Sequence, residues 1–265
     1  MEKSPGGPKQ ASLLPFWGKI LFFLFVFYLF LMAGCQVMNA ELHNTQGVKY
    51  LQEQKYDLAL SEFEGARLQA PEAPNAYYNI ASTYHQLGIK NHDTKMYSMA
   101  EQYYRLCLTK APNHTPCHRG LAVLLVETAR SEEAFALLRS WESRNSGNAD
   151  PKIEMARLFQ ELGQKEEAAK YLKSAIAVNP NETRAYNALA MLQESNGDYE
   201  NALENYKSSI ASVPNQTEIV SKIAFLENRT GLANPAAPTA PTILVPDSMA
   251  EPPQTASRDL MGPRF

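Results

Sequence analysis

Four side chains near the middle of the chain carry donor atoms that suit a metal ion. His114, Cys117 and His118 lie within five residues of one another, and Cys107 precedes them by seven. Zinc and copper prefer such thiolate and imidazole ligands. We nevertheless favour simple packing, because Cys107 fits a small buried position and the histidines flank a helix start. A metal-binding or metal-dependent catalytic module at His114, Cys117 and His118 stays the alternative function, and a Cys107–Cys117 disulfide is permitted in an oxidising compartment.

Two pairs of adjacent carboxylates are the other candidates for chemistry. Glu132–Glu133 and Glu166–Glu167 stand at the expected starts of helices, where acidic side chains complement the helix dipole. Adjacent helical positions diverge, so neither pair is placed for acid–base catalysis. The sequence has no nucleophile elbow, phosphate-binding glycine loop or His-Glu-x-x-His motif. We expect no enzyme, no cofactor and no small-molecule substrate.

Charge and cysteine content exclude further classes. The 265 residues are 45% apolar and 20% charged, with a net charge of −3. No basic run is present, so we expect no nucleic-acid partner. Three cysteines are too few for a disulfide-rich scaffold or a four-thiolate zinc site.

The first 35 residues have the composition of a targeting segment. Lys3, Lys9 and Lys19 precede an apolar run over residues 20–33, which is shorter than the roughly 20 residues of a membrane-spanning helix. Leu31-Met32-Ala33-Gly34-Cys35 resembles the lipobox of bacterial lipoproteins. That resemblance implies a signal peptide over 1–34, a lipid on Cys35 and a linker over 35–39. An uncleaved signal anchor is the alternative.

Small residues recur along the chain at a fixed period. One column keeps a constant interval, except that the step from its second to its third member is seven positions longer: Gly47, Ala81, Ala122, Ala156, Ala190 and Ala224. A second column has the same interval and the same longer step between its first two members: Ala59, Ala100, Ala134, Ala168 and Ala202. A large apolar residue follows each member of the second column by four positions. Such self-similarity predicts a stack of two-helix units.

This pattern resembles the tetratricopeptide repeat, whose period is about 34 residues. The resemblance implies an all-α, right-handed helix-turn-helix solenoid over 40–231. We assign units 40–73, 74–114, 115–148, 149–182 and 183–216, followed by a capping helix over 217–231. Gly88, Gly163 and Gly197 are expected between the two helices of their units. The shared slip of seven residues places an insertion within 89–97, and we expect it to lengthen the second helix of its unit.

The segment 232–265 holds seven of the chain's 17 prolines and no amphipathic period. We therefore predict a proline-rich disordered tail over 232–265.

These features together predict a membrane-anchored scaffold for protein–protein interaction in the bacterial cell envelope. The chain resembles lipoproteins of pilus assembly, which implies a role in assembling a pilus, secretion or cell-wall complex. The anchor implies a periplasm-facing protein on the cell membrane or outer membrane; Gln36 after the lipidated cysteine weakly favours the outer one. In such repeats the first helices line a concave groove that binds a protein or peptide. By offset from the small column, the groove residues are Asn44, Tyr78, Asn79, Ser82, His85, Arg119, Arg157 and Asn187.

Overall fold

The computed structural model describes residue 24 and residues 39–231 of the chain. Outside the described residues lie the predicted signal (except Leu24), the predicted anchor Cys35 and the segment 232–265. Within them the chain forms helices and turns without a strand, as the sequence predicts. Among these same residues, no helix combines the length and the apolar character that crossing a bilayer requires.

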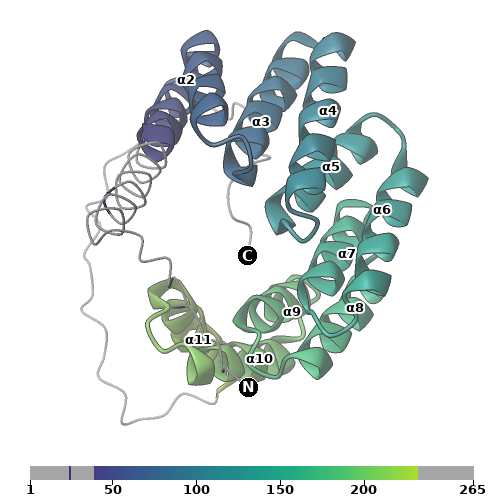
Figure 1. The fold of residues 1–265 in the computed structure, drawn as a ribbon. Helices are drawn as coiled ribbons and strands as arrows, with labels where there is room; N and C mark the ends of the chain where they lie inside the picture. Colours follow the sequence, from purple (N-terminus) through teal and green to yellow (C-terminus); the bar gives the residue numbers. More distant parts are fainter. Residues whose placement is uncertain (1–23, 25–38, 232–265) are drawn as a thin grey trace, which may run out of the picture. The chain divides into compact units, whose positions relative to one another are not determined.

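Each of the five assigned ranges holds two helices, which alternate in direction along the chain (Figure 1). Helical residues 39–52 come first. They are followed by α2 (Tyr56–Gln69), α3 (Pro74–Asn91), α4 (Thr94–Lys110), α5 (Thr115–Glu127), α6 (Ser131–Arg144), α7 (Asp150–Glu161), α8 (Lys165–Val178), α9 (Thr183–Ser195), α10 (Tyr199–Ser212) and α11 (Thr217–Thr230).

The contacts divide the chain into two compact units, which meet in sequence within α5. The N-terminal unit ends at Leu124 and the C-terminal unit begins at Leu125. In the N-terminal unit α3 packs against both α2 and α4. In the C-terminal unit the helices from α6 to α11 pack against one another in chain order.

Except for Ala224, the small residues of both columns are buried where helices approach each other closely. All five alanines of the second column are fully buried, as are the aromatic rings of Phe63, Tyr104 and Tyr206 that follow by four positions. A Cβ atom added at Gly47 would lie 2.5 Å from the Phe63 ring, so only glycine fits there. Ala224 is exposed, because α11 is the last described helix and no described residue packs on that side of it.

The turn inside each repeat depends on one residue with a left-handed backbone. In the last two repeats this residue is Gly163 (φ 75°) or Gly197 (φ 79°). Paired backbone hydrogen bonds close these turns: Gly163 N–H donates to Gln160 O and Gln164 N–H donates to Phe159 O. This is a Schellman cap, which favours glycine. Three non-glycine residues take the same conformation in the other repeats: Gln54, His92 and Ala129.

The insertion lies in the second repeat but is divided between both helices, which corrects the expectation that it lengthens the second helix alone. α3 has 18 residues, against 12 or 13 in α5, α7 and α9. α4 has 17 residues, against 14 in the other second helices. Gly88 consequently lies inside α3, against the Tyr97 ring, and His92 at φ 52° ends the helix instead.

Replacing Ala129 by glycine is expected to stabilise the C-terminal unit. Its Cβ is strained at φ 60°, and relief of that strain outweighs the extra unfolded-state entropy of glycine by about 1 kcal/mol. Ala136→Gly, at an exposed position inside α6, is the matched control and should lower stability by about 1 kcal/mol. Urea unfolding followed by circular dichroism measures both changes; a loss of stability in Ala129→Gly would contradict the assignment of the turn.

Candidate functional site

In the N-terminal unit, two predicted groove residues from neighbouring repeats pair with each other. Asn79 Nδ2 on α3 donates to Asn44 Oδ1 on the preceding first helix, at 3.2 Å. Asn44 is 9% exposed and Asn79 is half-buried, so the amide pair lies at the edge of the surface. An amide has two donor hydrogens and one acceptor oxygen, so the pair keeps hydrogen-bonding capacity for a peptide backbone.

Tyr78 lies next to this pair on α3 and is also half-buried. Its ring contacts the rings of Tyr104 and His114, with centroids 6.2 and 6.0 Å apart. Burial raises the pKa of Tyr78, and the nearby charge of Arg119 opposes that shift. Tyr78 therefore presents a neutral, rigid aromatic edge beside a cation.

Two other residues predicted to line the groove of this unit, His85 and Ser82, are buried instead. His85 is 1% exposed and packs edge-on against Tyr97 and Tyr104. Ser82 is 4% exposed. Both side chains share the predicted helix stripe with Tyr78 but belong to the core, and the Tyr97 and Tyr104 rings of α4 pack against His85.

The predicted groove residues of the C-terminal unit make internal contacts as well. Arg157 Nε lies 3.4 Å from Glu154 Oε2, and Glu154 is only 2% exposed, so much of this cation is neutralised. Asn187 Nδ2 donates to Gln216 Oε1 at 2.9 Å, which joins α9 to the start of α11. The Oδ1 atom of Asn187 is buried and accepts no hydrogen bond from the described residues.

One further pair on the first helices was not predicted from sequence. Arg184 Nη2 donates to Asp150 Oδ1 at 2.5 Å, between residues 34 positions apart. Its spacing equals the repeat period, which is a signal that the sequence does carry. The polar side chains in these pairs thus use part of their hydrogen-bonding capacity to connect neighbouring repeats.

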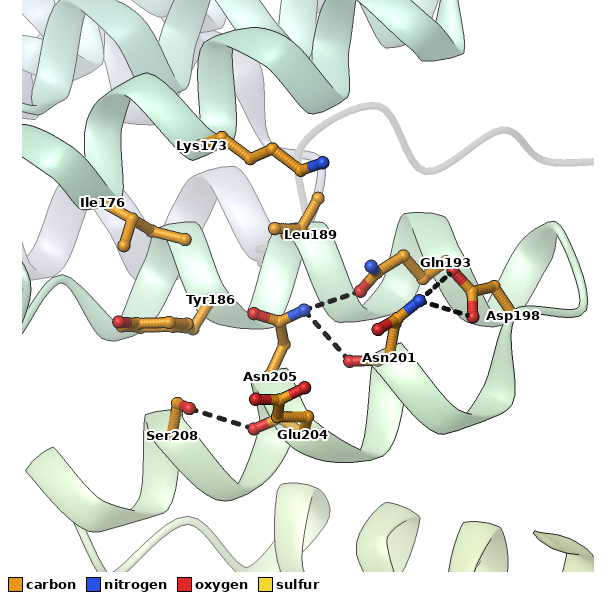
Figure 2. A pocket seen from close by; sticks show the side chains of 10 residues that line it. All are labelled: Lys173, Ile176, Tyr186, Leu189, Gln193, Asp198, Asn201, Glu204, Asn205 and Ser208. Atoms are coloured by element: carbon orange, nitrogen blue, oxygen red, sulfur yellow. Dashed lines mark hydrogen bonds between the residues drawn. The ribbon is translucent and has the colours of Figure 1, made fainter.

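A polar cavity of about 480 Å³ lies on a different stripe of the C-terminal unit (Figure 2). Tyr186, Leu189 and Gln193 of α9 line it, with side chains of α8 and α10 on either side. Asn205 Nδ2 donates to Gln193 Oε1 at 2.7 Å and to the Asn201 carbonyl at 3.0 Å. Sequence patterns gave no sign of this cavity, because isolated asparagines on helices resemble ordinary solvated residues.

The cysteine and histidine cluster is resolved into a disulfide and one neighbouring histidine. Cys107 at the end of α4 and Cys117 in α5 are bonded, with Cα atoms 6.4 Å apart, and both are fully buried. Nδ1 of His114 lies 3.5 Å from Cys107 Sγ. The alternative ligand set His114, Cys117 and His118 is therefore wrong in one member. Nε2 of His118 lies 2.9 Å from the Pro112 carbonyl oxygen, and the donor atoms that lie close together are those of Cys107, His114 and Cys117.

The ring of His114 is fixed at both nitrogens. Nδ1 accepts the Cys117 N–H at 3.3 Å, so Nε2 carries the proton and donates to Asn75 Oδ1 at 3.2 Å. Burial lowers the pKa of His114 and favours this neutral form. The cluster is therefore a covalent link between the second and third repeats, with a neutral imidazole beside it.

Reduction of the disulfide is expected to destabilise the N-terminal unit by about 2–4 kcal/mol, the usual range for a loop of this kind. Digestion of the purified chain without reductant should yield a Cys107–Cys117 linked peptide in mass spectrometry. A phosphine reductant should then lower the thermal midpoint. Two free thiols at these positions before reduction would contradict the assigned bond.

The stacked two-helix repeats define the class of the protein, a helical repeat protein. The model of the tetratricopeptide repeat family matches residues 44–90 and 153–217, so these two segments are similar to tetratricopeptide repeats. Stacked helix pairs of this kind form the extended surfaces that helical repeat proteins use to bind partner proteins. No curated protein has a sequence that matches the chain.

Several solved structures are similar to the chain. TTC0263, a thermophilic tetratricopeptide repeat protein of Thermus thermophilus, is 24% identical over 71% of this chain and 98% of its own, with a TM-score of 0.51. PilF of Pseudomonas aeruginosa is 15% identical over 74% of this chain and 86% of its own, with a TM-score of 0.46. PilW, a type IV pilus biogenesis factor, is 19% identical over 73% of this chain and 87% of its own, with a TM-score of 0.48. The first of these supports the same fold.

Proposed function

We propose that this protein is a lipid-anchored scaffold of the bacterial cell envelope that binds an extended segment of a partner protein on its first helices. The observation that carries the proposal is the Asn44–Asn79 amide pair, with the half-buried Tyr78 at the adjacent position of α3. Amides satisfy the backbone of an extended chain, and a rigid aromatic supplies contact area at little entropic cost.

The partner chemistry follows from the charges on this face. Arg119 is the predicted groove cation of the N-terminal unit, and Arg157 is paired with Glu154 in the C-terminal unit. A terminal carboxylate is usually held by several cations. An internal segment of mixed polarity therefore suits this face better than the end of a chain.

The anchor and the compartment rest on the sequence. Residues 31–35 fit a lipobox, and two or three acyl chains hold a protein stably at a membrane. A periplasm-facing location on the cell membrane or outer membrane agrees with an oxidising environment for the Cys107–Cys117 bond. Resemblance in sequence to pilus-assembly lipoproteins favours a role in assembling an envelope complex, of which pilus, secretion and cell-wall complexes are the forms we propose.

The binding face is tested with a double substitution, Tyr78→Ala and Asn79→Ala. Crosslinking in envelope preparations followed by mass spectrometry identifies the partner, and the double variant should capture it several-fold less because both the aromatic contact and an amide are lost. Circular dichroism checks that the helical content is unchanged.

A matched control is Gln102→Ala with Leu106→Ala, two exposed positions one turn apart on α4 of the same repeat. This pair should capture the partner as the unchanged chain does. Equal capture by all three proteins would rule out the first-helix face as the binding site.

The anchor is tested separately with Cys35→Ser. Metabolic labelling with a fatty acid should label the unchanged chain and leave the variant unlabelled and unprocessed. An unlabelled natural chain would exclude the lipoprotein and support the uncleaved anchor, while the face tested above could still bind its partner.

A further inference from the structure

The connection between α4 and α5 brings two sulfur atoms and one imidazole together inside the N-terminal unit. Ligand atoms of Cys107, His114 and Cys117 all lie within 4.8 Å of one another. We propose that these three side chains bind a thiophilic divalent cation of the zinc class when the disulfide is reduced. The disulfide and the cation exclude each other, because both use the same two sulfur atoms.

The spacing of the donor atoms is close to that of a zinc site. Usual bond lengths in a tetrahedral zinc site separate sulfur from nitrogen by about 3.6 Å and sulfur from sulfur by about 3.8 Å. Cys107 Sγ and His114 Nδ1 are already 3.5 Å apart. The two sulfurs must separate by only about 2 Å after reduction. Rotation about the Cα–Cβ bonds of the two cysteines can supply that movement.

The imidazole is already oriented for such a ligand role. Nδ1, the nitrogen that faces the sulfurs, carries no proton, since it accepts the Cys117 N–H. Its one lone pair must leave that N–H to bind the cation, and the Cys117 N–H then keeps its bond to His114 O at 3.1 Å. Nε2 donates to Asn75 Oδ1 at 3.2 Å. Metal-binding histidines usually donate their second ring N–H to such an oxygen, which fixes the ring and its tautomer. Asn75 is thus a positioning residue for the proposed site.

The backbone around the cluster holds the three residues in place without the disulfide. Ala111 N–H donates to Cys107 O at 2.8 Å, His114 N–H to Ala111 O at 3.0 Å and Cys117 N–H to His114 O at 3.1 Å. These bonds connect the end of α4 to the start of α5 residue by residue. Both cysteines are fully buried and His114 is half-buried, so the donors are shielded and the cation enters past the imidazole.

The chemistry balances with a reductant of the thiol class in the cell, or a phosphine in the test tube. A thiol reductant exchanges with the disulfide and leaves two protein thiols and an oxidised reductant disulfide. A phosphine does the same with one water molecule, giving two thiols and the phosphine oxide. Binding of the cation then releases the two thiol protons and forms two metal–sulfur bonds and one metal–nitrogen bond.

The proposal is tested by titrating the full chain, in detergent and without oxygen, with Co²⁺. All samples carry Cys35→Ser, so that Cys107 and Cys117 are the only thiols of the sequence. The phosphine-reduced chain should bind one Co²⁺ with thiolate-to-cobalt charge-transfer absorption, and Zn²⁺ should displace it. The disulfide form should show no such absorption.

Three variants separate a ligand role from a structural role. His114→Gln should weaken the affinity for Co²⁺ about 100-fold, and Asn75→Ala should weaken it about tenfold. His114→Cys supplies a thiolate at the same place and should restore tight binding. His92→Asn is the control, because His92 is exposed and asparagine tolerates its left-handed backbone, so the affinity should not change.

Two results would overturn the proposal. One is a reduced chain that keeps its helical content by circular dichroism and binds no stoichiometric Co²⁺, or binds it as tightly in His114→Gln. The other is loss of helical content on reduction that Zn²⁺ does not reverse, since no folded site then remains.

Discussion

Close contact between helices at the small residues sets the register of each stack. Gly47 lies directly against the Phe63 ring, and a Cβ atom at Gly120 would lie 2.5 Å from the Tyr104 ring. A larger side chain at either position would push the helices apart. Because neighbouring helices touch at these points, polar residues at fixed offsets from them meet their counterparts one repeat later. The Asn44–Asn79 and Asp150–Arg184 contacts follow from that register.

The periodic part of the fold could be predicted because burial depends on spacing, which a sequence displays directly. Ala59, Ala100 and the other alanines of the second column are all fully buried. The division of the insertion could not be predicted, because a slip in two columns locates extra residues but not the helix that contains them. His92 adopts the left-handed conformation in place of Gly88, so α3 ends later than glycine patterns indicate.

The candidate site was harder to predict, since helical offset gives the direction of a side chain and not its depth. His85 points along the same stripe as Tyr78, yet Tyr97 and Tyr104 of the lengthened α4 cover it. Of the residues in the metal-binding alternative, His118 lies outside the group of donor atoms that converge, and Cys107 belongs to that group. Proximity in sequence favoured His118, whereas the turn between α4 and α5 directs His114 toward Cys107.

The disulfide also affects the order in which the N-terminal unit opens. In a stacked array each repeat is stabilised mainly by its neighbours, so local unfolding spreads inward from an end. The Cys107–Cys117 bond joins the last turn of the second repeat to the first helix of the third. Local unfolding that begins at residues 39–52 and α2 is therefore limited at α4 by this covalent bond. We therefore expect the amide hydrogens of α4 near Cys107 and of α5 near Cys117 to exchange more slowly than those of residues 39–52 and α2.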